Sequence, residues 1–197
     1  TEQAARLGND LTPVGAEKAG NKDGTIPDWT GGLNDTPTDW KAGESYSDPF
    51  AEDTILFTID KTNMAQYADK LTVGQQAMLK TYSDYKLPVY KTRRTAKFTE
   101  EVVKIINTNA LNTELQANGN GLKNFIGVFP FPIPKNAKEV MWNHQLRWKG
   151  LFFKLHSIES IINRNGSFNL IQNTLEVYSV YHNINRPRKI NDWRYTY

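Results

Sequence analysis

Hydrophobic and polar positions follow two different periods along the chain, and the period changes near residue 150. Before that point, apolar residues recur every three or four positions in several short stretches, as is typical of amphipathic helices. After it, they alternate with polar residues over residues 152–162 and 167–181, which predicts strands. Asn165 and Gly166 lie between these two runs and predict a hairpin. The pattern favours an α+β fold with a helical first half and an antiparallel sheet in the second.

Capping residues mark the starts of the predicted helices. Thr72 and Gln75 have the spacing of a capping box, and we expect a short helix on each side of it within residues 58–82. Thr99 is the predicted N-cap of a further helix, which the apolar residues after it extend to about Leu111. These helices form the predicted first half of the folded domain.

The stretch from residue 118 to 150 has the most constrained backbone in the sequence. Its three alternating prolines push Phe129, Phe131 and Ile133, each of which precedes a proline, toward extended geometry. An extended apolar ribbon is therefore predicted over residues 125–134. It either closes a core or forms the floor of a cavity for an apolar ligand.

A helix of roughly three turns is expected after the ribbon. Asn136 is its predicted N-cap, and Gly150 lies where a glycine after the last turn is expected. Helical spacing places five residues on its predicted apolar, core-facing side, namely Ala137, Val140, Met141, His144 and Trp148. His144 is accordingly interpreted as a hydrogen-bonded core residue rather than a catalytic base.

Three motifs carry a family resemblance: LGNDLTPVGAEKAGNKDGTIPDWTGG, then YKLPVYKTRRTAKF, then GLKNFIGVFPFPIPKNAKEVMWNHQLRWKG. In this order they resemble a bacterial family of unknown function whose members are described as outer-membrane lipoprotein-sorting-like proteins. The resemblance implies a secreted, periplasmic protein of Gram-negative bacteria, with the signal peptide removed. It also implies a fold like that of the lipoprotein-localisation carriers, a curved antiparallel half-barrel wrapped on helices.

The same resemblance implies partners and cargo. Such proteins accompany an outer-membrane β-barrel protein and an inner-membrane exporter, which suggests lipid or other hydrophobic cargo. Members of the family are considerably longer than this chain, so we expect it to match their N-terminal half and to hold only part of the half-barrel. Its last residues, RPRKINDWRYTY, depart from the family pattern, and a truncated or processed form is expected.

The first 57 residues are rich in turn-forming residues but also contain widely spaced aromatic residues. We interpret them as an ordered extension that wraps the domain and is pinned by Trp29, Trp40, Tyr46 and Phe50. Trp29 is either such an anchor or an exposed partner-binding element. The expected division is an extension (1–57), one α+β domain (58–185, with helices in 58–150 and the hairpin in 152–181) and a tail (186–197).

Composition narrows the classes of function. With 39% hydrophobic residues and a mean hydropathy of −0.60, the sequence has no apolar run of the roughly 18 residues that a transmembrane helix needs. The absence of cysteine excludes disulfides and thiolate chemistry. The net charge is +3 but the basic residues are dispersed, so no nucleic-acid-binding surface is expected.

No catalytic or cofactor site is expected. His144, His156 and His182 lack the spacing of metal ligands, and no phosphate-binding loop or nucleophile elbow occurs. We therefore expect a protein that is not an enzyme. Arg93 and Arg94 either form salt bridges with acidic neighbours or contact an anionic headgroup or carboxylate.

The favoured function is a periplasmic carrier or accessory protein that binds a lipid, acyl chain or lipoprotein in outer-membrane-directed transport. Ten residues are predicted to line its hydrophobic cavity: Phe125, Val128, Phe129, Phe131, Ile133, Met141, Trp148, Phe152, Phe153 and Phe168. The alternative is a non-catalytic structural subunit that docks on an outer-membrane assembly, or forms a homo-oligomer, through the hairpin and the aromatic N-terminal segment. The terminal aromatic residues Trp193, Tyr195 and Tyr197 would then lie at the contact.

Overall fold

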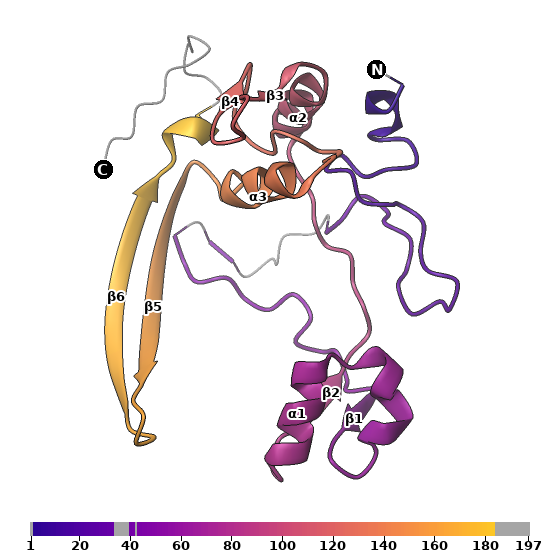
Figure 1. The fold of residues 1–197 in the computed structure, drawn as a ribbon, viewed down its shortest axis with the longest axis vertical. Helices are drawn as coiled ribbons and strands as arrows, with labels where there is room; N and C mark the ends of the chain where they lie inside the picture. The colour runs from indigo at the N-terminus through magenta and orange to yellow at the C-terminus, as the bar shows by residue number, and fades with distance from the viewer. Residues whose placement is uncertain (1, 34–39, 42, 184–197) are drawn as a thin grey trace. The chain divides into compact units, whose positions relative to one another are not determined.

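A computed structural model describes residues 2–33, 40–41 and 43–183 (Figure 1). The chain divides into two units, one made of Thr1–Lys18 with Phe98–Tyr197 and the other of Ala19–Lys97. The first eighteen residues thus belong with the second half of the chain, whereas the sequence pattern predicted a division after residue 57. The mixed helices and antiparallel strands confirm the α+β class. The tail at 186–197, with Trp193, Tyr195 and Tyr197, lies outside the described residues.

The unit of residues 19–97 contains four short elements: β1 (Phe57–Ile59), the 3₁₀ helix η2 (Met64–Lys70), α1 (Val73–Thr81) and β2 (Leu87–Val89). β1 and β2 pair antiparallel, and Ile59, Met64 and Leu79 form the core beneath them. The predicted capping box is confirmed, because Thr72 N–H donates to Gln75 Oε1 at 2.9 Å and Gln75 N–H donates to Thr72 Oγ1 at 3.2 Å.

The N-terminal part of this unit is held by residues that follow β2. Trp29 donates its indole N–H to the Ala96 carbonyl at 2.9 Å, and Leu33 N–H donates to the Thr95 carbonyl at 3.0 Å. Trp29 is therefore an anchor of the extension, the first of the two interpretations of this residue. Trp40 and Tyr46 instead stack on each other, with ring centroids 5.5 Å apart.

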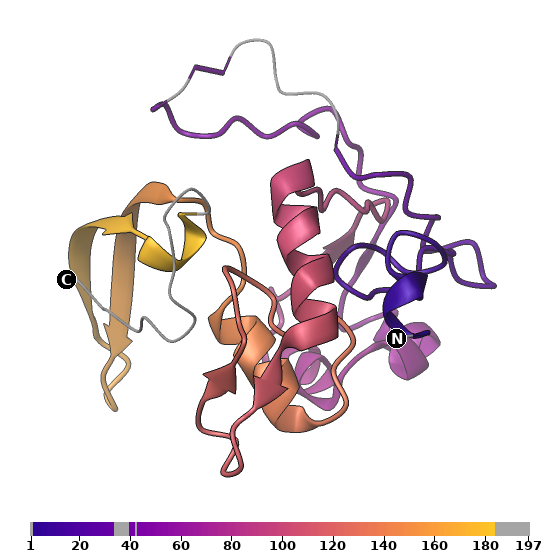
Figure 2. The same ribbon diagram turned by 90° about the horizontal axis from the view of Figure 1, so that it is seen from above.

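The described residues of the other unit form these elements: η1 (Ala4–Arg6), α2 (Glu100–Asn112), β3 (Glu114–Leu115), β4 (Leu122–Lys123), α3 (Ala137–Gln145), β5 (Phe152–Ile162), β6 (Phe168–Tyr178) and η3 (Val180–His182). η1 lies beside α2, as Figure 2 shows. β3 pairs with β4 and β5 with β6, so the sheets of the described chain are three antiparallel pairs.

The core of this unit forms where α2 meets the proline-rich ribbon. Val102 and Ile106 of α2 and Val128 of the ribbon are at most 1% exposed. Asn109, one helical turn after Ile106, is 1% exposed and bonds to the ribbon backbone. Its Nδ2 donates to the carbonyls of Ile126 and Val128 at 2.7 and 2.8 Å, while its Oδ1 accepts from Ile126 N–H at 3.1 Å. The ribbon is thus fixed by hydrogen bonds as well as by apolar packing.

The prediction that the apolar face of α3 turns toward the core is wrong. Val140 and Met141 are 51% and 54% exposed, and His144 is exposed rather than in the core. The buried side instead presents polar groups to the neighbouring backbone. Asn143 forms two hydrogen bonds with the backbone of Phe131. Its Oδ1 accepts from the Phe131 N–H at 2.9 Å, and its Nδ2 donates to the Phe131 carbonyl at 2.6 Å. Hydrogen bonding, which periodicity in hydrophobicity does not detect, orients this helix.

Two predictions of backbone geometry also fail near the ribbon. Phe129 has a φ of 45°, in the left-handed region rather than extended, although a proline follows it. Its N–H donates to the Leu146 carbonyl at 3.1 Å and its ring packs edge-on against Phe98, so tertiary contacts hold a conformation that costs about 1–3 kcal/mol. α3 ends at Gln145, well before Gly150, while its N-cap Asn136 is confirmed.

Candidate functional site

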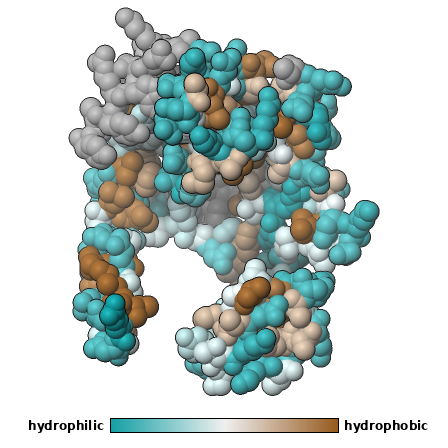
Figure 3. Space-filling model, in the orientation of Figure 1, coloured by the Kyte–Doolittle hydropathy of each residue, from teal (hydrophilic) through white to brown (hydrophobic). Residues whose placement is uncertain are grey.

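Many of the exposed large apolar side chains of the described chain lie on the β5–β6 hairpin. The alternating pattern and the Asn-Gly turn predicted this hairpin, whose register pairs Phe152 with Tyr178 at the base and Ile162 with Phe168 at the tip. No residue of either strand is buried. Figure 3 shows hydrophobic side chains gathered on the surface of the hairpin.

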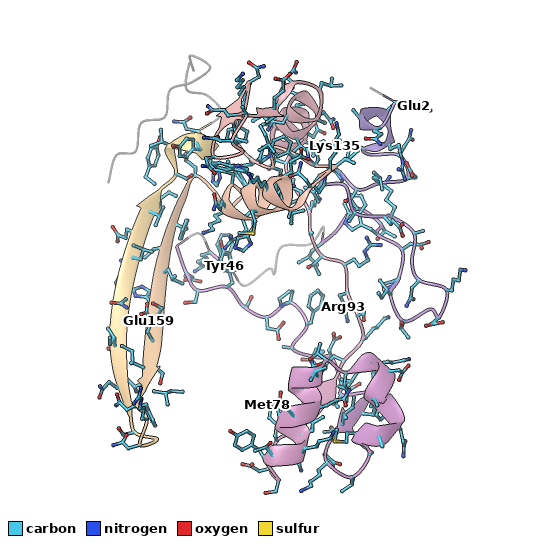
Figure 4. The ribbon with its side chains drawn as sticks, viewed as in Figure 1. Glu2, Tyr46, Met78, Arg93, Lys135 and Glu159 are labelled. Atoms are coloured by element: carbon cyan, nitrogen blue, oxygen red, sulfur yellow. The ribbon has the colours of Figure 1, made fainter. Side chains whose placement is uncertain are left out.

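Both faces of the hairpin are apolar, but in different places. The face of the even-numbered residues carries four large apolar side chains toward the tip, with exposed fractions of 60–76%: Ile158, Ile162, Phe168 and Leu170. The face of the odd-numbered residues carries its apolar side chains mainly toward the base: Phe153, Leu155, Leu175 and Val177. Polar contacts between the strands include the Lys154–Glu176 ion pair toward the base, at 3.0 Å, and the bond from Asn173 to Glu159 nearer the middle (Figure 4).

The structure distributes the ten predicted cavity residues over several places. Val128 and Phe129 pack in the core, where Trp148 lies against it. Phe125 is half-buried, Met141 is exposed on α3, and Phe152 and Phe168 are each 61% exposed at opposite ends of the hairpin. Phe153 is half-buried near the hairpin base. Of the ten, Phe131 and Ile133 line one cleft together.

That cleft has a volume of about 380 Å³ and lies between η1, the end of α2 and the ribbon. Glu139, 8% exposed, lies in its wall and accepts bonds from Lys135 N–H at 2.6 Å and Asn136 Nδ2 at 3.0 Å. These bonds complete the cap of α3, so the burial of Glu139 has a structural explanation. Figure 4 labels Lys135, which also lines the cleft. The spacing from Asn136 to Glu139 is the sequence signal that indicates this cap.

The two arginines lie in the unit of residues 19–97. Arg93 forms a bidentate ion pair with Asp53, with Nε 2.8 Å from Oδ2, and its guanidinium lies 4.2 Å from the centre of the Phe50 ring. This hydrogen-bonded partner lowers the pKa of the Asp53 carboxyl. Arg94 donates to the carbonyls of Ala19 and Pro27 at 3.4 and 3.3 Å. Both side chains thus bond to other segments of the same unit. An anionic ligand would have to compete with these bonds.

Two of the histidines form hydrogen bonds in different parts of the chain. His156 bonds to Thr174 across the hairpin at 3.0 Å, and the buried His182 bonds to the Gly150 carbonyl at 2.8 Å. Within the described ranges, no three His, Cys, Asp or Glu side chains are grouped so as to hold a metal ion. Every helix in that part of the chain is too short or too polar to cross a bilayer.

The fold and its exposed hairpin define an α+β protein whose distinguishing surface is apolar. The chain belongs to the protein family of unknown function DUF1329, whose model matches residues 58–197. It is 46% identical over 171 residues to uncharacterized protein PA3922 of Pseudomonas aeruginosa. That match covers 86% of this chain and 38% of the relative, so the chain spans well under half of the relative's length. No solved structure matches the chain.

Proposed function

We propose that this chain is a non-catalytic part of a periplasmic protein that binds hydrophobic cargo during outer-membrane-directed transport. The cargo is a lipid, an acyl chain or the lipid of a lipoprotein. The observation that supports this proposal is the hairpin, whose large side chains are apolar on both faces and exposed. Contiguous apolar patches on a soluble protein mark surfaces that bind an apolar ligand or partner.

The tip of the even-numbered face is the part of the hairpin best suited to an acyl chain. Ile162 and Phe168 are directly opposite each other, and Ile158 and Leu170 extend the patch along the same face. Covering one such side chain completely contributes about 1.5–3 kcal/mol. A cargo that covers three or four of them would therefore gain enough free energy to bind. Among the strand residues of this face, the charged ones are Lys154 and Glu176, which pair toward the base, while Arg164 lies in the turn beside the tip.

A second candidate is a structural subunit that docks on an outer-membrane β-barrel protein, an inner-membrane exporter or another assembly. The observation that favours it is that β5 and β6 each have a single strand neighbour within the described chain. Unpaired strand edges offer backbone hydrogen bonds to another polypeptide. In this case the hairpin binds protein rather than lipid.

The direct test is to remove the apolar tip and measure lipid binding. The triple variant Ile158→Thr, Ile162→Thr and Phe168→Thr keeps strand propensity and removes apolar surface. We expect it to lose most of the bound lipid seen by native mass spectrometry of the purified chain, and most displacement of a hydrophobic dye. The matched control is Ser160→Thr with Gln172→Thr, which changes polar positions on the same face.

The outcomes separate the two candidates. The control should bind dye and lipid like the parent chain. If the parent chain carries no lipid and displaces no dye, cargo binding is wrong. Three results together would instead favour the structural subunit. The parent chain would capture an outer-membrane protein, a variant with disrupted strand edges would lose this capture, and the triple threonine variant would keep it.

A further inference from the structure

The outer edge of β6 has backbone groups that point away from the hairpin. Asn163 N–H donates to the Ser167 carbonyl at 2.8 Å, and Ser179 N–H donates to the Leu151 carbonyl at 2.7 Å. Both of these bonds join residues with odd numbers. Bonded and non-bonded pairs alternate along an antiparallel ladder, so the other pairs of odd-numbered residues in the hairpin are also bonded. The even-numbered residues of β6 therefore direct their N–H and C=O groups outward.

The two edges of the hairpin differ in how well they are protected. Charged side chains on an edge strand discourage pairing with another strand. β5 carries Lys154 and Glu159 in addition to His156, whereas Glu176 is the one charged residue of β6. The Lys154–Glu176 pair, at 3.0 Å, compensates both of these charges, which leaves Glu159 of β5 as the strand charge outside that ion pair. β6 is thus the edge more open to pairing.

We propose that two copies of this chain pair antiparallel through β6, about a two-fold axis at Asn173. β6 runs from Phe168 to Tyr178, and Asn173 is its central residue, so this register uses the whole strand. The axis is perpendicular to the sheet, because only then do the two equivalent edges meet. Gln172 faces Thr174 of the second copy, where the outward backbone groups of both residues can bond.

The side chains match in this register. Residues directly opposite each other in an antiparallel pair lie on the same face and interact. Phe168 then faces Tyr178 of the second copy, and Ile171 faces Leu175 of the second copy. All four side chains are 41–61% exposed in the single chain. No like charges meet, because Glu176 faces Leu170 of the second copy.

Pairing would convert two marginal ribbons into one four-stranded sheet. An isolated two-stranded hairpin is marginally stable, whereas three or more strands with an apolar face are stable. The perpendicular axis also keeps the patches of Ile158, Ile162, Phe168 and Leu170 from both copies on one side of the sheet. This pairing needs no cargo, so it holds or fails independently of the proposed function.

Cysteine cross-linking tests the register, since the chain has no cysteine of its own. In the proposed dimer the two copies of Asn173 form a non-bonded pair about 4.5 Å apart at Cα, which suits a disulfide. We expect Asn173→Cys to form a covalent dimer under mild oxidation, several-fold more than Ser157→Cys. Ser157 is the equivalent central position of β5. Equal cross-linking of the two variants, or more at Ser157→Cys, would overturn the proposal.

Analytical ultracentrifugation of the full chain tests the pairing without an engineered thiol. We expect a concentration-dependent dimer, and Gln172→Pro should raise its dissociation constant about tenfold or more by removing an outward N–H from each copy. The matched control is Ser160→Pro, an outward position on β5, which should dimerise like the parent. A parent chain that stays monomeric up to its solubility limit, or whose β6 pairs only with another polypeptide, would refute the proposal.

Discussion

The α2–ribbon core and the β5–β6 hairpin contain similar side chains in opposite environments. Ile106 on α2 is 0% exposed, whereas Ile158 on β5 is 64% exposed. The core is closed by segments far apart in the sequence, since Val128 and Asn109 bring the ribbon onto α2. Among the described residues, β5 and β6 of the hairpin pair with each other and with no other strand. The comparison shows that a strong local pattern can form an element without burying it.

The largest expected effect contrasts one isoleucine in each region. Ile106→Ala removes a fully buried side chain and should lower the free energy of unfolding by about 2–5 kcal/mol. Ile158→Ala, at an exposed position, should change it by less than about 0.5 kcal/mol. Urea denaturation followed by fluorescence measures both. A comparable loss for Ile158→Ala would show that the hairpin is covered in solution.

The next effect tests hydrogen bonding in the core. Asn109→Ala removes the partners of three backbone groups of the ribbon, one buried and two partly buried, and should cost about 2–4 kcal/mol. Asn112→Ala removes one exposed bond from the same helix, to the Thr108 carbonyl, and should cost less than about 0.5 kcal/mol. Equal losses from the two variants in the same denaturation assay would contradict the assigned role of Asn109.

A smaller effect is expected at the hairpin turn. Gly166 has a φ of 82° and open space where a Cβ would lie, so the cost of Gly166→Ala is conformational and amounts to about 1 kcal/mol. Because the hairpin is separate from the core, the loss should be local. Amide hydrogen exchange should speed up in β5 and β6 and stay unchanged in α2. Faster exchange in α2 would show that the two regions unfold together.

The smallest effect is expected for the solvent-facing ion pair between Arg93 and Asp53. The bonds from Arg93 depress the pKa of Asp53 in the folded chain. The pair therefore stabilises the fold above the unfolded pKa of about 3.9, and this contribution is lost as the pH falls through the depressed folded value. NMR titration of the Asp53 carboxyl should show the low pKa, and Arg93→Gln should raise it to the ordinary range. An unchanged titration would mean that the pair does not persist in solution.

Local signals predicted the elements well and the packing of α3 poorly. The caps at Thr72, Thr99 and Asn136 were confirmed because each depends on groups within three residues. The exposed face of α3 and the left-handed Phe129 were missed because they depend on partners elsewhere in the chain. The ten predicted cavity residues were chosen as apolar, and hydropathy alone does not tell a core residue from a ligand contact.

The sequence by itself determined the α+β class, the helix starts and the place of the hairpin turn, since capping, turn residues and period-2 alternation act over a few residues. Only the tertiary structure decided which apolar residues are buried. Burial requires a second surface, and for α2 the ribbon supplies it, with Val128 packed in the core and its carbonyl bonded to Asn109 of the helix. For the hairpin, the described chain supplies no such surface, so its large apolar side chains stay exposed.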